Sequence, residues 1–406
     1  MVEPATQAPI APQPPAVITT LDPSLENYAG TVSPSFSPRR AERRQASRSR
    51  RYRRRSLLWR ESSLSRVRKC GRVRRGDLVA VRRGPNGAGF SGLTTCGSPW
   101  ACPVCNAKIA AVRRLEVGAA VAAWMARGGA VLFVTRTLRH HRGHQLAQLW
   151  DGLAGAWRSM LGGKAWQTRK TALGLHGLVR VVETTTGDNG WHVHVHALLF
   201  ISGDVSDDQV ADFGGWSAAR WSRAVVRQGL PAPLAVGQDV RVIRDVRDSA
   251  LADYLAKMDE SGRDADALGL ELTHTQSKQA RDVHATRPVW DLLTDVEKGD
   301  ADALDRWHEW ERVSKGRKQL MWSPGLRRDL LGAAPERSDE DIAGQDHHGE
   351  DLVLITADGW SYLVQHPPVI PKVLDAAEHS PSLLRQLLDD HSIPFLAPPP
   401  QRSEPG

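Results

Sequence analysis

Three histidines alternate with hydrophobic residues in one short run of the chain. His192, His194 and His196 stand in the sequence Trp-His-Val-His-Val-His-Ala-Leu-Leu-Phe, residues 191–200. Since successive side chains of a β-strand point to opposite faces, the three imidazoles would line one face. Neutral imidazole is the commonest metal ligand, so the run indicates a metal site; rings that only hydrogen-bond their neighbours are the alternative. The opposite face would pack on a layer beneath the sheet through Val193, Val195, Ala197 and Leu199.

All four cysteines of the chain lie ahead of this run. Cys96, Cys102 and Cys105 form a tight cluster that ends in a Cys-x-x-Cys pair, and Cys70 stands upstream, next to a glycine. A tetrahedral Zn²⁺ takes four thiolates, and nearby glycine and proline suit the tight turns that bring thiolates together. The cysteines therefore predict one structural Zn²⁺ site. A redox pair at Cys102 and Cys105 is the alternative, but it leaves the other two cysteines without a role.

The elements that would position the histidines follow a definite order. Hydrophobic periodicity predicts strands over 130–138, 177–185, 191–201 and 239–243, and helices over 144–161 and 207–227. The order β-α-β-β-α-β is that of the split βαβ (ferredoxin-like) arrangement, a four-stranded antiparallel sheet with helices on one face and the other face free. The first strand would then lie beside the histidines and bring Thr135 and Thr137 next to them. The predicted class is α+β, with the cysteine module before the sheet and helical extensions after it.

A tyrosine follows the last predicted strand. Tyr254 and Lys257 are three residues apart in a short predicted helix, so they share a helix face. The other three tyrosines lie in a predicted disordered segment or near the carboxyl end. A phenol needs a charged neighbourhood to act as a nucleophile at neutral pH, and a metal ion with Lys257 would supply one. Ordinary packing of a helical Tyr and Lys is the simpler alternative.

Three motifs in this order resemble those of the HUH endonucleases: Thr135-Arg136-Thr137 in a β-run, His194-Val195-His196 in a strand and Tyr254-Leu255-Ala256-Lys257 in a helix. Among these enzymes the chain most resembles the replication initiators (Rep proteins) of bacterial rolling-circle plasmids. The Cys-x5-Cys-x2-Cys cluster and the run over 316–326 look like those initiators too. The resemblance covers residues 70–330.

The resemblance implies an activity, cofactors and partners. Tyr254 would nick one strand at the plasmid origin, forming a 5′-phosphotyrosine and a 3′-OH primer, and the strand would later be rejoined. Mg²⁺ or Mn²⁺ would be bound by His194 and His196, with Glu183 or His192 as third ligand. The hairpin register decides whether Glu183 shares the histidine face: a five-residue loop turns it away, and a four-residue loop or a bulge turns it in. The implied partners are origin DNA, as a single strand or a supercoiled hairpin, and a host helicase and polymerase.

The chain departs from the family at one position. Many relatives carry a glutamate one helical turn before the nucleophilic tyrosine, where it is thought to activate water at termination. Ala250 occupies that position here. Asp248 and Asp253 are the candidate substitutes.

Positive charge is concentrated near the amino terminus. The net charge is +8, yet residues 39–75 carry 17 Lys and Arg against two Glu. Such a segment, poor in apolar residues, predicts a flexible arm that binds phosphates, with Arg53, Arg54 and Arg55 as DNA contacts; a solvated tail is the alternative. Other candidate DNA contacts are Arg136, Arg317 and Lys318.

The predicted organisation has five parts: a disordered arm over 1–56, basic from 39; a zinc module and helix over 57–128; the endonuclease domain over 129–262; a helical, basic extension over 263–333; and a hairpin, helix and loose tail over 334–406. The last two parts include a helix over 288–311, a hairpin over 351–365 turned at Asp358-Gly359 and a helix over 372–390. No apolar run reaches the ~20 residues that span a bilayer, so we expect a cytoplasmic protein without a membrane partner.

Two other functions fit parts of the pattern. A conjugative relaxase or a single-strand transposase would use similar chemistry, but a relaxase more often carries its tyrosine ahead of the histidines. A non-catalytic zinc-ribbon DNA-binding regulator would take its affinity from the basic arm and the zinc site, and its histidines would be structural.

Overall fold

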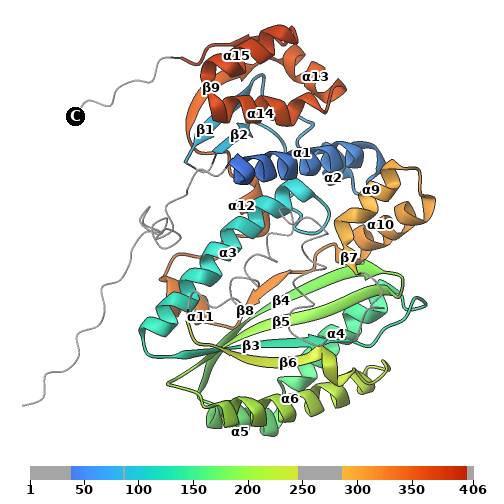
Figure 1. Ribbon diagram of the computed structural model, residues 1–406, viewed down its shortest axis with the longest axis vertical. Helices are drawn as coiled ribbons and strands as arrows, with labels where there is room; N and C mark the ends of the chain where they lie inside the picture. The colour runs from blue at the N-terminus through green and yellow to red at the C-terminus, as the bar shows by residue number, and fades with distance from the viewer. Residues whose placement is uncertain (1–37, 86, 246–285, 400–406) are drawn as a thin grey trace, which may run out of the picture.

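The computed structural model describes residues 38–85, 87–245 and 286–399. Its larger sheet has six strands, and all its neighbouring strands pair antiparallel. Across the sheet they are β6 (Gln238–Ile243), β3 (Ala130–Thr137), β5 (Gly190–Ile201), β4 (Leu175–Gly187) and β7 (Arg287–Pro288), with β8 (Leu320–Trp322) also paired to β4. The four longest strands match the predicted ones, and the α+β class is confirmed (Figure 1).

Helices that connect these strands cover one face of the sheet. They are α4 (Leu146–Met160), α5 (Gly163–Ala172) and α6 (Asp207–Arg227). The residues that alternate with the histidines, Val193, Val195, Ala197 and Leu199, are buried in this core as predicted. The start of α6 is defined by a capping box, in which Ser206 and Gln209 each accept a hydrogen bond from the other's backbone N–H.

The prediction that the other face of the sheet is free is wrong for part of it. The helices α3 (Pro103–Ala126) and α11 (Leu326–Leu331) pack on Leu198 and Phe200, which continue the histidine side of β5. Trp124 of α3 donates a hydrogen bond to the carbonyl of Ile201 at 2.9 Å and so fastens the helix to the end of that strand. The apolar half of this face therefore belongs to the core, and the histidines lie at its polar end.

A second sheet joins segments from opposite ends of the described chain. Its four strands, in order, are β10 (Phe395–Leu396), β9 (Glu350–Ile355), β1 (Val79–Gly84) and β2 (Gly87–Ser91). With α13 (Ala357–Gln365), α14 (Val369–His379) and α15 (Pro381–Asp390) it encloses a core of its own (Figure 1). The predicted separation of 57–128 from 334–406 is wrong, because β1 and β9 are hydrogen-bonded neighbours.

Two predicted elements near the carboxyl end need correction. The hairpin expected over 351–365 is a strand followed by a helix, because Thr356 caps α13 by accepting a hydrogen bond from the Gly359 N–H at 3.3 Å. The Asp358-Gly359 pair lies in the first turn of that helix. The single helix expected over 372–390 divides at Ser380, whose hydroxyl accepts from the Leu383 N–H and starts α15.

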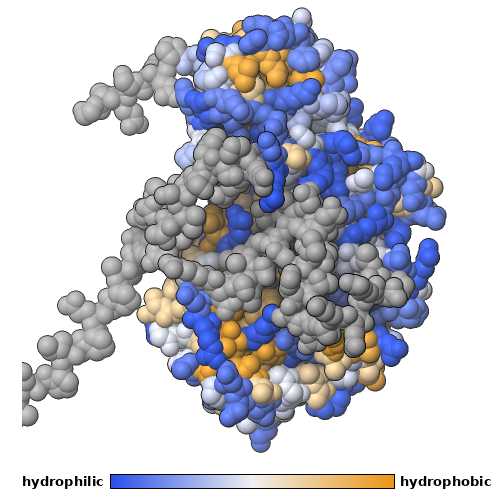
Figure 2. Space-filling view, viewed as in Figure 1, coloured by the Kyte–Doolittle hydropathy of each residue, from blue (hydrophilic) through white to orange (hydrophobic). Residues whose placement is uncertain are grey.

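The predicted flexible basic arm is an α-helix from residue 38 onward. Helix α1 (Pro38–Glu61) lies across the molecule beside α14 and α9 (Leu292–Glu297), where the visible surface is hydrophilic (Figures 1 and 2). Arg48 pairs with Asp375 at 2.5 Å and with Glu378, both on α14. The prediction failed because it considered repulsion within the segment and not the acidic residues elsewhere in the chain that neutralise it.

The segment expected as one helix over 288–311 contains two. A 3₁₀ turn (Val289–Asp291) leads into α9, and α10 (Ala301–Ser314) begins after Gly299, which has a φ of +90° in the left-handed region that glycine favours. The Asp300 side chain caps α10 by accepting from the Ala303 N–H. No helix within the described ranges is both long and apolar enough to cross a membrane.

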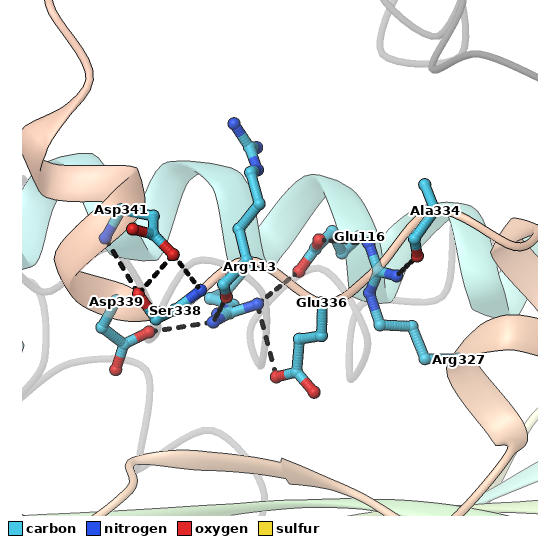
Figure 3. Close-up of polar contacts among 9 residues, drawn as sticks. Arg113, Glu116, Arg327, Ala334, Glu336, Ser338, Asp339 and Asp341 are labelled. Atoms are coloured by element: carbon cyan, nitrogen blue, oxygen red, sulfur yellow. Dashed lines mark hydrogen bonds and ion pairs between the residues drawn. The ribbon is translucent and has the colours of Figure 1, made fainter.

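A buried ionic network fastens the chain after α11 to α3 (Figure 3). Arg113 pairs with Glu116 at 2.9 Å and with Asp339 at 3.0 Å. Arg327 of α11 pairs with the other oxygen of Glu116 at 3.0 Å. All three members on α3 and α11 are buried, so Glu116 pairs with two guanidinium groups away from water, and Asp339 adds a second, less buried partner for Arg113.

Candidate metal centres

The turn between β4 and β5 decides which residues face the histidines. The strands run to Gly187 and resume at Gly190, so only two residues form the loop. Because the loop has an even number of residues, Glu183 lies directly opposite His194 on the neighbouring strand, and the two side chains point to the same face of the sheet. Gly190 has a φ of +87°, which glycine adopts without strain and which lets the chain reverse so tightly.

Glu183, His194 and His196 form a group that fits a metal ion. One potential ligand atom from each lies within 4.8 Å of the others, and the Glu183 Oε2 atom is 3.0 Å from His194 Nε2 and 3.4 Å from His196 Nε2. All three residues are buried. Glu183 Oε1 and His194 Nδ1 have no hydrogen-bond partner, which is costly for buried polar atoms unless a ligand completes the site.

The charge balance of this group favours a bound cation. Burial acts to raise the pKa of Glu183, but the imidazoles of His196 and His194 outweigh it and hold that pKa well below its ordinary value. The carboxylate is therefore ionised at neutral pH. A carboxylate with two imidazoles is a donor set that suits several divalent ions, including Mn²⁺.

His192 lies outside this group. Its Nδ1 is 2.9 Å from His140 Nε2, and the Nδ1 of His140 is 3.0 Å from the carbonyl of Asn189. Burial, together with the neighbouring rings, lowers the pKa of His192 to about 3, so this ring is neutral. Of the two candidates for third ligand, the geometry brings Glu183 to the histidine pair and turns His192 toward His140. The sequence had not indicated His140.

The first strand lies beside the histidines as predicted. Thr135 pairs with His196 and Thr137 with His194. The Thr135 hydroxyl is 3.0 Å from His196 Nδ1, which leaves the Nε2 atom of that ring on the side of Glu183. Thr137 Oγ1 accepts a hydrogen bond from Gln238, a residue that the sequence did not single out.

Arg136 was expected to contact DNA, and that expectation is wrong. Its side chain is fully buried and donates to Ser217 on α6 and to the carbonyls of Thr135 and Asp239. Burial lowers its pKa to about 10. Side chains alternate between the two faces of a strand. Because Thr135 and Thr137 face the histidine side, Arg136 between them points to the helix-covered face.

The four cysteines meet in one buried cluster. The sulfur atom of Cys70 is 3.6 Å from that of Cys102 and 3.5 Å from that of Cys105, and the sulfurs of Cys96 and Cys105 are 3.7 Å apart. Zn–S bonds of about 2.3 Å would set sulfur atoms about 3.8 Å apart in a tetrahedron, whereas a disulfide needs about 2.05 Å. Thiol donors from the other three hold the pKa of Cys105 well below its ordinary value. The cluster therefore suits a metal ion bound by four thiolates.

The predicted DNA contacts in α1 have structural partners. Arg54 pairs with Asp291 at 2.6 Å, and Arg53 pairs with Glu297 at 2.8 Å while its side chain stays largely exposed. Arg55 is buried, with its guanidinium 4.4 Å from the Tyr52 ring centroid. Arg54 and Arg55 thus serve the packing of α1, which corrects their assignment to DNA.

The other candidate residues divide into two sets. Arg317 pairs with Asp151 at 2.8 Å, and Lys318 is exposed beside it. The residues at the proposed nucleophile lie outside the described ranges: Asp248, Ala250, Asp253, Tyr254 and Lys257.

Comparison with known proteins defines the class. The pattern of the replication protein family matches residues 91–321, which include both metal-site groups except Cys70. A protein named Protein rep from Streptomyces lividans is 31% identical over 333 residues, 66% of this chain and 72% of that protein. A protein from Streptomyces cyanogenus named neomycin resistance protein is 31% identical over 151 residues, 31% of this chain and 35% of the relative. No solved structure matches.

The chain belongs to the replication protein family. Its place is among the Rep initiators of plasmid replication, in agreement with the resemblance seen in the sequence motifs.

Proposed function

We propose that this initiator nicks one strand of plasmid origin DNA to start rolling-circle replication, with Tyr254 as nucleophile. The observation that supports the proposal most is the convergence of Glu183, His194 and His196 within 4.8 Å beside the motif strand β3. These residues would hold Mg²⁺ or Mn²⁺, which supplies positive charge to the phosphoryl oxygens of a bound phosphodiester. The cysteine cluster would hold a structural Zn²⁺.

The proposed reaction conserves the energy of the broken bond. The phenolic oxygen of Tyr254 attacks the phosphorus and loses its proton, and the bond from phosphorus to the 3′ oxygen breaks. The 3′ oxygen takes up a proton and becomes the primer, while the 5′ phosphate stays on the tyrosine. Lys257 stabilises the phenolate. The same steps in reverse, with a 3′-OH as nucleophile, rejoin the strand after one round.

A concentration of positive charge near the histidine strand supports a DNA substrate. Arg306 lies 4.9 Å from the ring centroid of Trp191, the residue before His192, and it contacts Thr186 in the facing strand. Burial lowers the pKa of Arg306, and repulsion from Arg287 and Arg142 lowers it further, while Glu309 and Asp300 act to raise it. The repulsion that remains among these cations would be relieved when a polyanion binds.

The decisive test replaces the nucleophile. We expect Tyr254→Phe to abolish nicking of supercoiled origin plasmid and to leave DNA binding within about twofold, because only the phenolic oxygen is lost. The matched control is Tyr362→Phe, in α13, which should nick like the parent protein. Open circles and their covalently attached protein are measured on denaturing gels, and mass mapping identifies the linked residue.

The same assay separates the competing functions. Undiminished cleavage by the Tyr254→Phe variant would refute the assignment of the nucleophile. Binding of origin DNA by the parent protein with no cleavage at any divalent cation concentration would favour the non-catalytic DNA-binding regulator.

A further inference from the structure

A cavity of about 180 Å³ lies on the face of the main sheet opposite the histidines. Since one ordered water needs roughly 15 Å³ of such space, the cavity has room for a much larger group. Arg180 and Val182 of β4 form its floor, and because they alternate with Glu183 they point to the side of α4. The rest of its lining is Trp100, Trp150, Leu153, Ala154, Arg317 and Lys318.

Three cationic side chains line this cavity, and none of the described residues that line it is acidic. Arg180 is the most telling of them. Its Nε atom is buried without a hydrogen-bond partner, and its Nη2 atom lies 2.9 Å from the sulfur of Met321, a weak acceptor. Arg180 is half-buried, and with its Nε atom buried and only this weak acceptor at Nη2 its guanidinium is under-satisfied, so an anionic ligand would complete its hydrogen bonds.

Two tryptophans form an aromatic wall next to these cations. The ring centroids of Trp100 and Trp150 are 5.1 Å apart, and the Arg317 guanidinium lies 5.1 Å from the Trp150 ring. Hydrogen bonds hold both indoles in place: Trp100 donates to the carbonyl of Arg317 at 2.7 Å and Trp150 donates to Thr184 at 3.1 Å. Arg317 is already paired with Asp151, so Arg180 is the cation with unused hydrogen-bonding capacity. A fixed aromatic surface beside cationic side chains is the combination that binds bases and phosphates of single-stranded nucleic acid.

We infer that this cavity binds one nucleotide, with its phosphate on Arg180 and Lys318 and its base against the tryptophan wall. The nucleotide belongs to a single DNA strand, an assignment that rests on the proposed function. The cavity would be a second contact for the strand, on the side of the sheet away from the cleaved phosphate.

The test compares two variants that lose the same charge. Affinity for a labelled single-stranded oligonucleotide is measured by fluorescence anisotropy without divalent cations, so that no cleavage takes place. Arg180→Met, which keeps the apolar stem, should weaken binding about tenfold and reduce the salt dependence by about one phosphate contact. The control Arg385→Met, on α15, should stay within twofold. Unchanged affinity in Arg180→Met overturns the inference.

A second variant protects the test against misfolding. Lys318 is exposed, so Lys318→Ala should fold normally and should weaken the same oligonucleotide about threefold. If Arg180→Met does not fold, parent-like affinity of Lys318→Ala overturns the inference instead.

Competition separates the sources of the ligand. We expect dAMP to displace the oligonucleotide only at concentrations at least a hundredfold higher, and inorganic phosphate to be weaker still because it lacks a base. Tighter binding of dAMP than of the oligonucleotide would overturn the assignment to a DNA strand. Equal competition by phosphate and dAMP would overturn the role of the tryptophans.

The result does not depend on the nicking step. If no phosphotyrosine ever forms but Arg180→Met still loses affinity, the proposed cleavage fails and the nucleotide cavity stands. If Tyr254→Phe abolishes cleavage and Arg180→Met binds like the parent protein, the cavity fails and the cleavage stands.

Discussion

At the scale of single residues, the carboxylate of Glu183 changes what the histidine strand can bind. The imidazoles supply nitrogen donors, whereas the Glu183 carboxylate brings a full negative charge within 3.0 Å of His194. Its lowered pKa keeps that charge in place. Hard divalent ions such as Mg²⁺ and Mn²⁺ need an anionic oxygen ligand, so Glu183 is the residue on which their affinity should depend most.

A pair of substitutions tests this ligand assignment. Glu183→Gln keeps the shape of the side chain and removes its charge, and we expect it to weaken Mn²⁺ binding at least about tenfold. His192→Asn should change the affinity by less than about threefold, because that ring is engaged with His140. Isothermal titration calorimetry measures both. A larger loss in His192→Asn than in Glu183→Gln would assign the third ligand to His192.

At the scale of elements, the cysteine cluster and the histidine strand are connected through tryptophans in contact with one another. Trp100 lies in the loop between Cys96 and Cys102, and its ring centroid is 5.5 Å from that of Trp310 on α10. Trp310 in turn stacks on Trp191 at the start of β5, with centroids 6.0 Å apart. The loop that the cysteines hold is therefore part of the support of the candidate catalytic strand.

Loss of the metal from the cysteine cluster should therefore disturb the packing of that strand. We predict about one Zn²⁺ per chain in reduced protein, and its loss in Cys102→Ser together with a shift in tryptophan fluorescence and a lower Tm. Atomic absorption measures the metal content. His194→Ala is the control and should keep its Zn²⁺, since it lies in the other group. A folded Cys102→Ser protein with parent-like Tm would contradict a structural zinc site.

The docking of α1 onto α14 should depend on pH. Burial acts to raise the pKa of Glu378, but hydrogen bonds from Arg48 and from the Ala88 N–H, with the charge of Arg48, lower it below the ordinary 4.5. A lowered folded-state pKa stabilises the fold above pH 4.5, and this contribution disappears as the pH falls through the folded-state value.

Glu378→Gln should accordingly lower the free energy of unfolding by about 1 kcal/mol at pH 7, a value discounted for partial exposure. The difference from the parent protein should vanish well below pH 4.5. Glu350→Gln, an exposed residue of β9, is the control for the change in charge. Urea unfolding followed by circular dichroism measures the free energy of unfolding of each protein at pH 7 and at low pH. A difference between Glu378→Gln and the parent protein that persists at low pH would contradict the ion pair.

At the scale of the whole molecule, segments far apart in sequence close the structure. The second sheet pairs β1 with β9, and α1 reaches both α14 and α9. The ionic network of Figure 3 acts in the same way, since Glu116 joins α3 to Arg327, 211 residues later. Such contacts between residues far apart in sequence hold the segment before the main sheet against the segment after it.

The network supplies a test of this closure. Glu116→Gln should lower the free energy of unfolding by about 3–5 kcal/mol, because it leaves two buried guanidinium groups with one balancing charge fewer. Glu336→Gln removes the more exposed partner of Arg113, 3.5 Å away, and should cost less than about 1 kcal/mol. Chemical denaturation measures both, and equal losses would contradict the role given to burial.

The sequence predicted the elements whose pattern is local. The alternation in 191–201 and the helical period in 207–227 appear in β5 and α6 almost residue for residue, since burial of one face leaves a period of 2 or 3.6 in the chain itself. The prediction of a hairpin at Asp358-Gly359 was wrong because this pair is typical of a tight turn. The helix there depends on the N-cap at Thr356, a weaker sequence pattern. The alternation of side chains that predicted the histidine face also predicts that Arg136 points to the opposite, helix-covered face of the sheet.

By itself, then, the sequence determined the order of the strands, the histidine face, the cysteine spacing and the family, because these depend on neighbours within a few residues. Only the tertiary structure decided that Glu183 faces His194, that Cys70 joins the other cysteines and that the arginines of α1 have acidic partners. These outcomes depend on strand register and on pairs of distant residues. Two distant residues interact only after the chain between them has folded and brought them together. Their interaction therefore imposes no periodic pattern on the neighbouring sequence.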